Sequence, residues 1–200
     1  NSKICKYFDI PIQHCNNEVL KRMGRHTNKE QIVSLINKIK SEIPEATLRT
    51  SLIVGFPGET QEQFNELLEF VKEAGFERLG VFPYSEEEGT YSALKLKDDV
   101  PTEEKQRRAD RIMSLQEQIS LDNNLERVGR TMRIIVDSRQ GDFYVARSEY
   151  DSPEVDQEIL IPAHLRQLRR GRFYEARITG AENFDLYGEV IAPVRKKCGK

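Results

Sequence analysis

The stretch Arg49-Thr-Ser-Leu-Ile-Val-Gly-Phe-Pro-Gly-Glu59 predicts a strand that ends in a tight turn. Its apolar, β-branched run stops at Gly55, and a Pro-Gly pair then turns the chain toward Thr60, a residue type that caps helix N-termini. In sheets that alternate strands with helices, such strand ends form the edge where ligands bind. The glycines allow a sharp turn, and we expect the first amides of the next helix to be free for a polar ligand.

The segments around this turn predict a parallel sheet. Residues 7–13, 47–54 and 78–82 have the composition of strands, and helical periodicity follows each of them. Residues 85–99 are expected to be a charged loop before a long helix. Strands joined by helices pair in parallel. A parallel sheet usually has more than these three strands, and other elements cover both of its faces. We therefore expect residues 1–122 to be part of a larger barrel or open sheet.

The helices of this half have recognisable start and stop signals. Thr27 with Glu30 predicts a capping box, in which each side chain satisfies a backbone amide of the first turn. Thr60 with Gln63 predicts a second one, at the helix that follows the tight turn. Gly75 predicts the end of that helix, because glycine readily adopts the left-handed conformation found there.

The second half has a different pattern, because the helical period disappears after residue 122. Five short strands punctuated by Gly and Pro predict a small antiparallel barrel of the oligonucleotide-binding (OB-like) type over residues 123–195, with a tail at 196–200. Residues 125–195 contain 11 Arg or Lys against 12 Asp or Glu, a formal charge of -1. Barrels that bind RNA are usually basic, so this balance disfavours RNA binding.

Composition sets the wider limits. The 200 residues are 38% hydrophobic and 32% charged with a formal net charge of -2, as expected for a globular chain that is not dominated by phosphate binding. No apolar run is long enough to span a membrane. Cys5, Cys15 and Cys198 match neither a disulfide framework nor a metal-ligand motif. A reducing, cytoplasmic setting is therefore expected.

Polar residues on the predicted strands are candidates for ligand contact. Gln13 ends the first strand, and Arg49 and Ser51 share one face of the second, because side chains alternate along a strand. Polar groups that face the inside of a barrel are costly without a polar partner. Two alternatives remain open at this point: Gln13 with His14 could cap its own turn, and Arg49 could reach solvent at a sheet end.

Five motifs in combination resemble one enzyme family over essentially the whole chain. The first three, Pro11–His14, Arg49–Thr60 and Val81–Thr90, resemble those of radical S-adenosylmethionine (SAM) methylthiotransferases. The other two, Ala146–Pro153 and Asp185–Glu189, resemble those of the C-terminal TRAM domain of that family. The similarity is greater to the branch that modifies a ribosomal protein than to the branch that modifies tRNA.

The resemblance implies a fold and an activity. The implied fold is the later half of a TIM-like radical SAM barrel with parallel strands, followed by the TRAM barrel. The implied reaction adds a methylthio group to the β-carbon of an aspartate on a small-subunit ribosomal protein. The alternatives are a tRNA adenosine methylthiotransferase and an RNA- or ribosome-binding module that acts through the TRAM domain.

The resemblance also implies cofactors. They are S-adenosylmethionine and two 4Fe–4S clusters, whose cysteine ligands belong to sequence upstream of this chain. No metal ligand and no catalytic residue of this chain is implied, and the chain is expected to be inactive alone. Six positions are assigned by the resemblance to the S-adenosylmethionine side of the barrel, at one common mouth: Gln13, Arg49, Ser51 and Gly55, with Phe56 and Tyr84 near the adenine.

Overall fold

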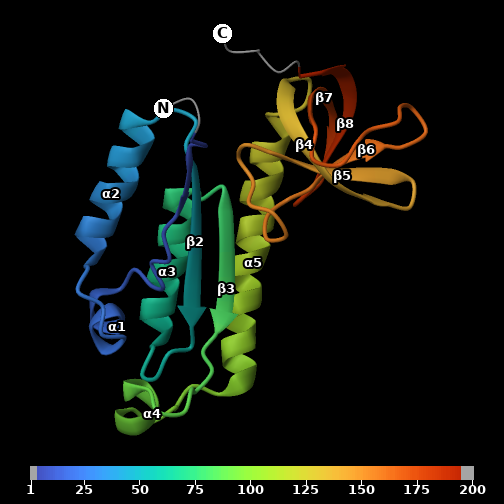
Figure 1. Cartoon of the computed structure of the whole chain (residues 1–200). Helices are drawn as coiled ribbons and strands as arrows, with labels where there is room; N and C mark the ends of the chain where they lie inside the picture. Colours follow the sequence, from blue (N-terminus) through green and yellow to red (C-terminus); the bar gives the residue numbers. More distant parts are fainter. Residues whose placement is uncertain (1–3, 195–200) are drawn as a thin grey trace. The chain divides into compact units, whose positions relative to one another are not determined.

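Figure 1 shows a computed structural model of the chain, which describes residues 4–194. Contacts divide the chain into two compact units. The α/β unit comprises residues 8–119, and the barrel unit comprises residues 1–7 and 120–200. The tail expected at 196–200, with Cys198, lies outside the described residues. Within residues 4–194, no helix is both long and apolar enough to cross a membrane.

Strands and helices alternate through the α/β unit, and its strand order is β1-β2-β3. Register pairs of β2 and β3, such as Ser51 with Gly80, run in parallel, which confirms the predicted parallel sheet. The long helix α5 enters the barrel unit at Ser120. The elements are β1 (Tyr7–Asp9), α1 (Asn17–Arg22), α2 (Lys29–Glu42), β2 (Thr47–Val54), α3 (Gln61–Ala74), β3 (Arg78–Pro83), α4 (Tyr91–Lys95) and α5 (Thr102–Leu125).

One face of β2 forms the core of the α/β unit with the helices. Leu48, Leu52 and Val54 alternate along β2 and are buried, because every second side chain points to the same face. They share one apolar cluster with buried residues of α2, α3 and α5, among them Phe64 and Ile112. Arg49, Ser51 and Ile53 are less buried and occupy the opposite face, as the sequence predicted for Arg49 and Ser51.

Several local predictions for this half are confirmed. Thr60 and Gln63 form the predicted capping box, with the Gln63 N–H donating to the Thr60 hydroxyl at 3.3 Å. Gly75 ends α3 at a φ of 55°, in the left-handed region that favours glycine. The second strand has the predicted bounds, Thr47–Val54.

Three local predictions are wrong. The capping box of α2 uses Asn28 and Gln31, because the Asn28 side chain accepts from the Gln31 N–H at 2.9 Å. The first strand ends at Asp9 rather than at residue 13; Pro11 has no N–H to donate, and Gln13, at a φ of 69°, forms a single bridge to Leu52. The loop expected at 85–99 contains α4, whose first turn is capped by Thr90.

The barrel unit contains the five predicted strands, which close into a barrel in the order β4-β5-β6-β8-β7. The prediction of an antiparallel barrel is wrong for one pair, because β6 and β8 run parallel. In a closed ring with an odd number of strands, direction cannot alternate all the way round, so one neighbouring pair must be parallel. The strands are β4 (Thr131–Gln140), β5 (Phe143–Ser148), β6 (Ile159–Pro162), β7 (Phe173–Ala181) and β8 (Leu186–Pro193).

The inside of this barrel is an apolar core. Ile134, Ile159, Ile178 and Leu186 are almost completely buried and belong to one cluster. Side chains that alternate with them point outward, so charged residues of β4, β5 and β7 line the outer surface. The outside of the barrel is therefore where a partner of this unit can be recognised.

Candidate functional site

The turn between β2 and α3 is closed by its own glutamate. Glu59 is 4% exposed, and its Oε2 accepts from the backbone N–H of Gly55 at 2.8 Å and of Phe56 at 3.3 Å. The N–H of Gly58 donates to Asp99 Oδ1 at 2.7 Å, and the N–H of Thr60 donates to Gln63 Oε1 at 3.1 Å. Side chains of the protein therefore occupy these four amides of the turn.

A buried ion pair holds Glu59 in place. Arg108 of α5 donates through Nη1 to Glu59 Oε1 at 2.8 Å and to the Glu59 carbonyl at 3.0 Å. Both side chains are almost fully buried. Burial raises the pKa of Glu59, and the Arg108 guanidinium opposes that shift. The pair therefore attaches the start of α3 to helix α5, and it sets the conformation of the turn.

His14 lies beside this pair and has a structural role. Its Nδ1 accepts from the Asn16 N–H at 2.9 Å, and its Nε2 is 3.8 Å from Glu59 Oε2. Asn16 in turn caps α1. This geometry favours the alternative in which the His14 side chain caps its own turn.

We expect acid to destabilise the protein through His14. Burial is the main cause that lowers the His14 pKa from 6.5 to about 3. The unfolded chain binds a proton below pH 6.5 and the folded chain does not, so stability that is complete above pH 6.5 is lost as the pH falls toward 3. At about pH 5 the loss from this group approaches roughly 2 kcal/mol.

Guanidinium chloride unfolding at neutral pH and at about pH 5 measures this loss. The raised pKa of Glu59 acts in the opposite direction, so the protein is compared with a His14→Gln variant to isolate His14. The variant should lose less stability than the parent on acidification. An equal loss in both proteins would contradict the assignment.

Three of the predicted residues meet at the carboxyl edge of the sheet. Gly55 directly follows β2, and the Tyr84 N–H donates to the Val54 carbonyl at 2.8 Å. The rings of Phe56 and Tyr84 pack edge to face, with their centres 5.1 Å apart. The Tyr84 hydroxyl is buried and has no hydrogen-bond partner among the described residues. This hydroxyl is a polar group that a ligand at the edge can satisfy.

The structure adds Lys105 to this group. Lys105 is 5% exposed, its Nζ lies 5.0 Å from the centre of the Tyr84 ring, and it pairs with Asp98 Oδ2 at 2.5 Å. Gly55 has a φ of 69°, and a Cβ on it would overlap Cγ of Lys105. No local signal in the sequence connects Lys105 to Gly55, because α5 starts far along the chain.

Gln13 and Ser51 lie on the open face of the sheet, further from the carboxyl edge than Gly55. Arg49 lies further still from that edge. The backbone of Gln13 accepts from Ile53 at 2.8 Å and donates to Ser51 at 2.9 Å, which places Gln13 beside the second half of β2. Arg49 is six positions before Gly55, or about 20 Å along an extended strand. Its Nη1 pairs with Asp9 Oδ2 at 2.8 Å. The structure therefore groups Gln13 with Ser51, and it groups Gly55 with Phe56 and Tyr84. Arg49 lies toward the opposite end of β2, so the expectation of one common mouth is wrong for Arg49.

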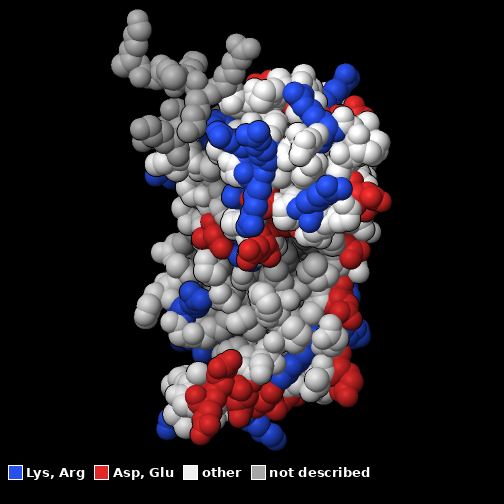
Figure 2. Space-filling model, turned by 45° about the vertical axis from the view of Figure 1, so that its right-hand side comes forward, with Lys and Arg blue, Asp and Glu red and all other residues white. Residues whose placement is uncertain are grey.

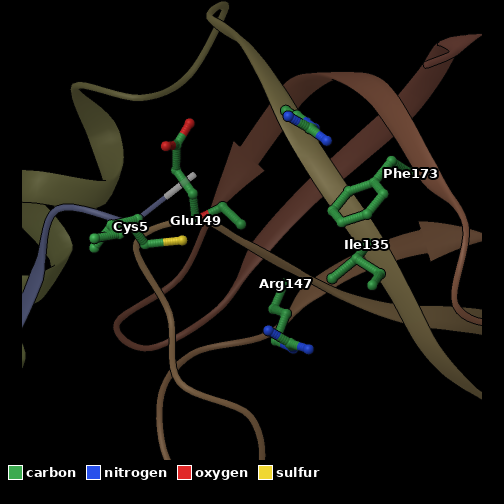
Figure 3. A pocket seen from close by; sticks show the side chains of 8 residues that line it. Cys5, Ile135, Arg147, Glu149 and Phe173 are labelled. Carbon is green, nitrogen blue, oxygen red and sulfur yellow. The ribbon is translucent and has the colours of Figure 1, made fainter. Parts of the chain in front are cut away.

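The outer surface of the barrel unit has a pocket of about 500 Å³. Figure 3 shows Phe173, Ile135 and Arg147 along one side of this pocket, and Cys5 and Glu149 along the other side. The wall follows strand register, because Ile135 of β4 is paired with Arg147 of β5 and with Phe173 of β7. Arg133, which also lines the pocket, has its guanidinium carbon 4.3 Å from the centre of the Phe173 ring. The pocket therefore combines an aromatic ring with two guanidinium groups.

Charges of each sign gather locally on the barrel unit although they nearly cancel in number. The upper part of Figure 2 shows Lys and Arg side chains gathered over the barrel unit, with Asp and Glu next to them. Such gathering produces local fields of either sign. The formal charge of a domain is therefore a weak guide to what its surface binds.

Comparison with known proteins identifies both units. Residues 1–71 match the radical SAM superfamily, and residues 128–191 match the TRAM domain. The chain is similar over nearly its whole length to radical SAM methylthiotransferases. Three similar proteins share the name "Ribosomal protein uS12 methylthiotransferase RimO". This confirms the resemblance that the sequence motifs indicated.

The three relatives come from bacteria. The protein of Parabacteroides distasonis is 49% identical over 188 residues, which are 94% of this chain and 43% of that protein. The protein of Bacteroides thetaiotaomicron is 46% identical over 188 residues, with the same shares of 94% and 43%. The protein of Christiangramia forsetii is 46% identical over 195 residues, which are 98% of this chain and 43% of that protein. The chain thus spans less than half the length of these relatives.

The match of residues 1–71 to the radical SAM superfamily implies S-adenosylmethionine and an iron–sulfur cluster. Among residues 4–194, no group of three or more His, Cys, Asp or Glu side chains is placed to hold a metal ion. Cys15 is fully buried, and burial raises the pKa of its thiol to about 12, so it is a poor thiolate ligand.

Proposed function

We propose that this chain is the later part of a radical SAM methylthiotransferase that adds a methylthio group to the β-carbon of an aspartate on a small-subunit ribosomal protein. The main support is the similarity to proteins named for uS12 methylthiotransfer, at 46–49% identity over nearly the whole chain. The parallel sheet, with one face packed on helices and the other less buried, supports a place within a larger TIM-like barrel. A ribosomal substrate places the enzyme in the cytoplasm.

The edge of the sheet and the open face of β2 would hold S-adenosylmethionine. The buried Tyr84 hydroxyl without a partner is the observation that fits a polar ligand there, with Gly55 and Phe56 beside it. Gln13 and Ser51 would contact the ligand further along the open face, and Arg49 would do so from the far end of the row. When bound, S-adenosylmethionine supplies the radical chemistry, and these residues bind and orient it.

The two 4Fe–4S clusters of the proposal would be held by cysteines of the full-length protein outside this chain. Clusters of this type need several thiolates, and the described residues hold no candidate group of ligands. The contribution of this chain is therefore to position S-adenosylmethionine and the substrate. On this proposal the chain alone is inactive.

Mass spectrometry of two candidate substrates tests the proposed activity. The full-length protein with reconstituted clusters is incubated with the small-subunit ribosomal protein and, in a parallel reaction, with tRNA. The proposal predicts a methylthio group on the ribosomal protein and none on tRNA. A methylthio group found on tRNA adenosine instead would assign the protein to the tRNA-modifying branch.

We expect substitutions on the open face of β2 to weaken the binding of S-adenosylmethionine. In the full-length protein, Ser51→Val and Arg49→Ala should each reduce affinity by about ten-fold, since each removes roughly one polar contact. Glu69→Ala, an exposed change on α3, serves as the control and should leave affinity unchanged. Equilibrium titration measures the three affinities, and wild-type affinity in both face variants would reject this assignment.

RNA binding by the barrel unit is a second candidate function. One observation favours it: the Arg133 guanidinium lies over the Phe173 ring in an open pocket, a combination on which unstacked bases can pack. A gel shift with unspecific RNA that weakens with salt, and that Arg133→Glu removes, would support it. No shift at moderate salt would leave the barrel with a role in docking the protein substrate.

A further inference from the structure

A second pocket on the barrel unit has a different chemistry from the pocket of Figure 3. It has a volume of about 260 Å³ and lies at the β4–β5 hairpin and the segment before β6. Four carboxylates line it against two guanidinium groups, so its charge balance is negative: Asp137, Glu154, Asp156 and Glu158 with Arg147 and Arg170.

Three of these six charged groups have partners, and the carboxylate of Glu158 is among those that do not. Asp137 pairs with Arg147 at 2.9 Å, and Asp156 accepts from the Ser152 N–H at 2.7 Å. No hydrogen bond or ion pair joins the Glu158 carboxylate to any residue within 4–194. Burial, with the like charges of Asp185 and Asp137, raises the pKa of Glu158. The pocket therefore has negative charge that its own cations do not neutralise.

The neighbouring residue, Gln157, provides an independent observation. Gln157 is 6% exposed and lines the same pocket, yet neither its Oε1 nor its Nε2 has a hydrogen-bond partner among the described residues. A buried amide without partners costs free energy, and native proteins rarely leave one unsatisfied. A side-chain amide has one acceptor and one donor group, which matches the N–H and C=O of a peptide backbone.

We propose that this pocket binds a basic side chain, arginine or lysine, of a protein segment, with the cation at Glu158 and the backbone of the segment at Gln157. The negative balance of the pocket selects a cation and disfavours a phosphate. The amide of Gln157 favours a peptide over a small inorganic ion. If the proposed function is correct, the segment belongs to the ribosomal-protein substrate, and the pocket helps to select it.

Peptide binding tests this proposal separately from methylthiotransfer. The full-length protein is titrated by fluorescence anisotropy with two short labelled peptides, which differ only in a central arginine or norvaline. The arginine peptide should bind about ten-fold more tightly, as expected for one charge-assisted hydrogen bond. Glu158→Gln should remove this preference. The control is Glu175→Gln, which changes an exposed carboxylate of β7 outside the pocket and should retain the preference.

Three outcomes would overturn the proposal. Equal affinity for the two peptides in the wild-type protein means that the pocket holds ordered water only. A preference for arginine that survives Glu158→Gln places the cation elsewhere. A labelled RNA that binds more tightly than the arginine peptide, and tighter still after Glu158→Gln, identifies a nucleic-acid surface. Because binding is measured without turnover, absence of methylthiotransfer would reject the proposed function without deciding this one.

Discussion

Replacing Glu59 by alanine should destabilise the protein by about 3–5 kcal/mol, because it leaves a buried Arg108 charge without its main partner. Two backbone hydrogen bonds to the Glu59 carboxylate would also be lost, which adds to the destabilisation. The N–H groups of Gly55 and Phe56 would lose the carboxylate oxygen to which they donate. Arg108 would keep its contact with Glu104 at 2.8 Å, which limits the loss but does not replace the buried pair. Denaturant unfolding of the variant and the parent measures the difference.

Two further variants separate the causes of this loss. Glu59→Gln keeps an oxygen for the turn amides and removes the charge, so it should cost less than Glu59→Ala. Glu69→Ala removes an exposed glutamate of the same helix and should change the unfolding free energy by less than about 0.5 kcal/mol. If Glu59→Ala were as mild as Glu69→Ala, the buried pair would not be what fixes the turn.

Replacing Gly55 by alanine should be the second most damaging change, at about 2–5 kcal/mol. Its φ of 69° is costly for any residue with a Cβ, by roughly 1–2 kcal/mol. The added Cβ would also overlap the side chain of Lys105 near its base. Lys105 is buried and paired with Asp98, so it cannot move away freely, and such overpacking costs about 1–3 kcal/mol.

Gly75 provides a matched control for Gly55. It has a similar φ of 55°, but a Cβ there would meet no atom within 4 Å. Gly75→Ala should therefore show the conformational cost alone, and the difference between the two variants measures the overlap with Lys105. Thermal unfolding of both variants gives this difference. Equal destabilisation would contradict the close approach of Lys105 to the turn.

The parts of the fold that were predictable from the sequence depend on local signals. The strand Thr47–Val54 is marked by its composition and by the turn that follows it. The end of α3 at Gly75 follows from the conformational freedom of glycine. The start of α2 was misplaced by one residue, because Thr27 and Asn28 are both good caps and only the geometry selects Asn28.

The parts that were missed depend on contacts between distant segments. The buried partner of Glu59 is Arg108, 49 positions away, and nothing near Glu59 in the sequence identifies it. The close approach of Lys105 to Gly55 also joins distant segments, and no local signal in the sequence identifies it. The position of Arg49, away from the edge and paired with Asp9, depends on how β1 is placed beside β2. The parallel pair β6–β8, in contrast, follows from the number of strands once the barrel is known to close.

We propose that the full-length protein modifies an aspartate of a small-subunit ribosomal protein. Fragmentation mass spectrometry of that ribosomal protein tests it most directly, in cells that lack the gene and in cells that have it restored. We expect a methylthio group on the aspartate β-carbon only where the gene is present. An identical, unmodified ribosomal protein in both strains would show that the protein does not carry out this reaction.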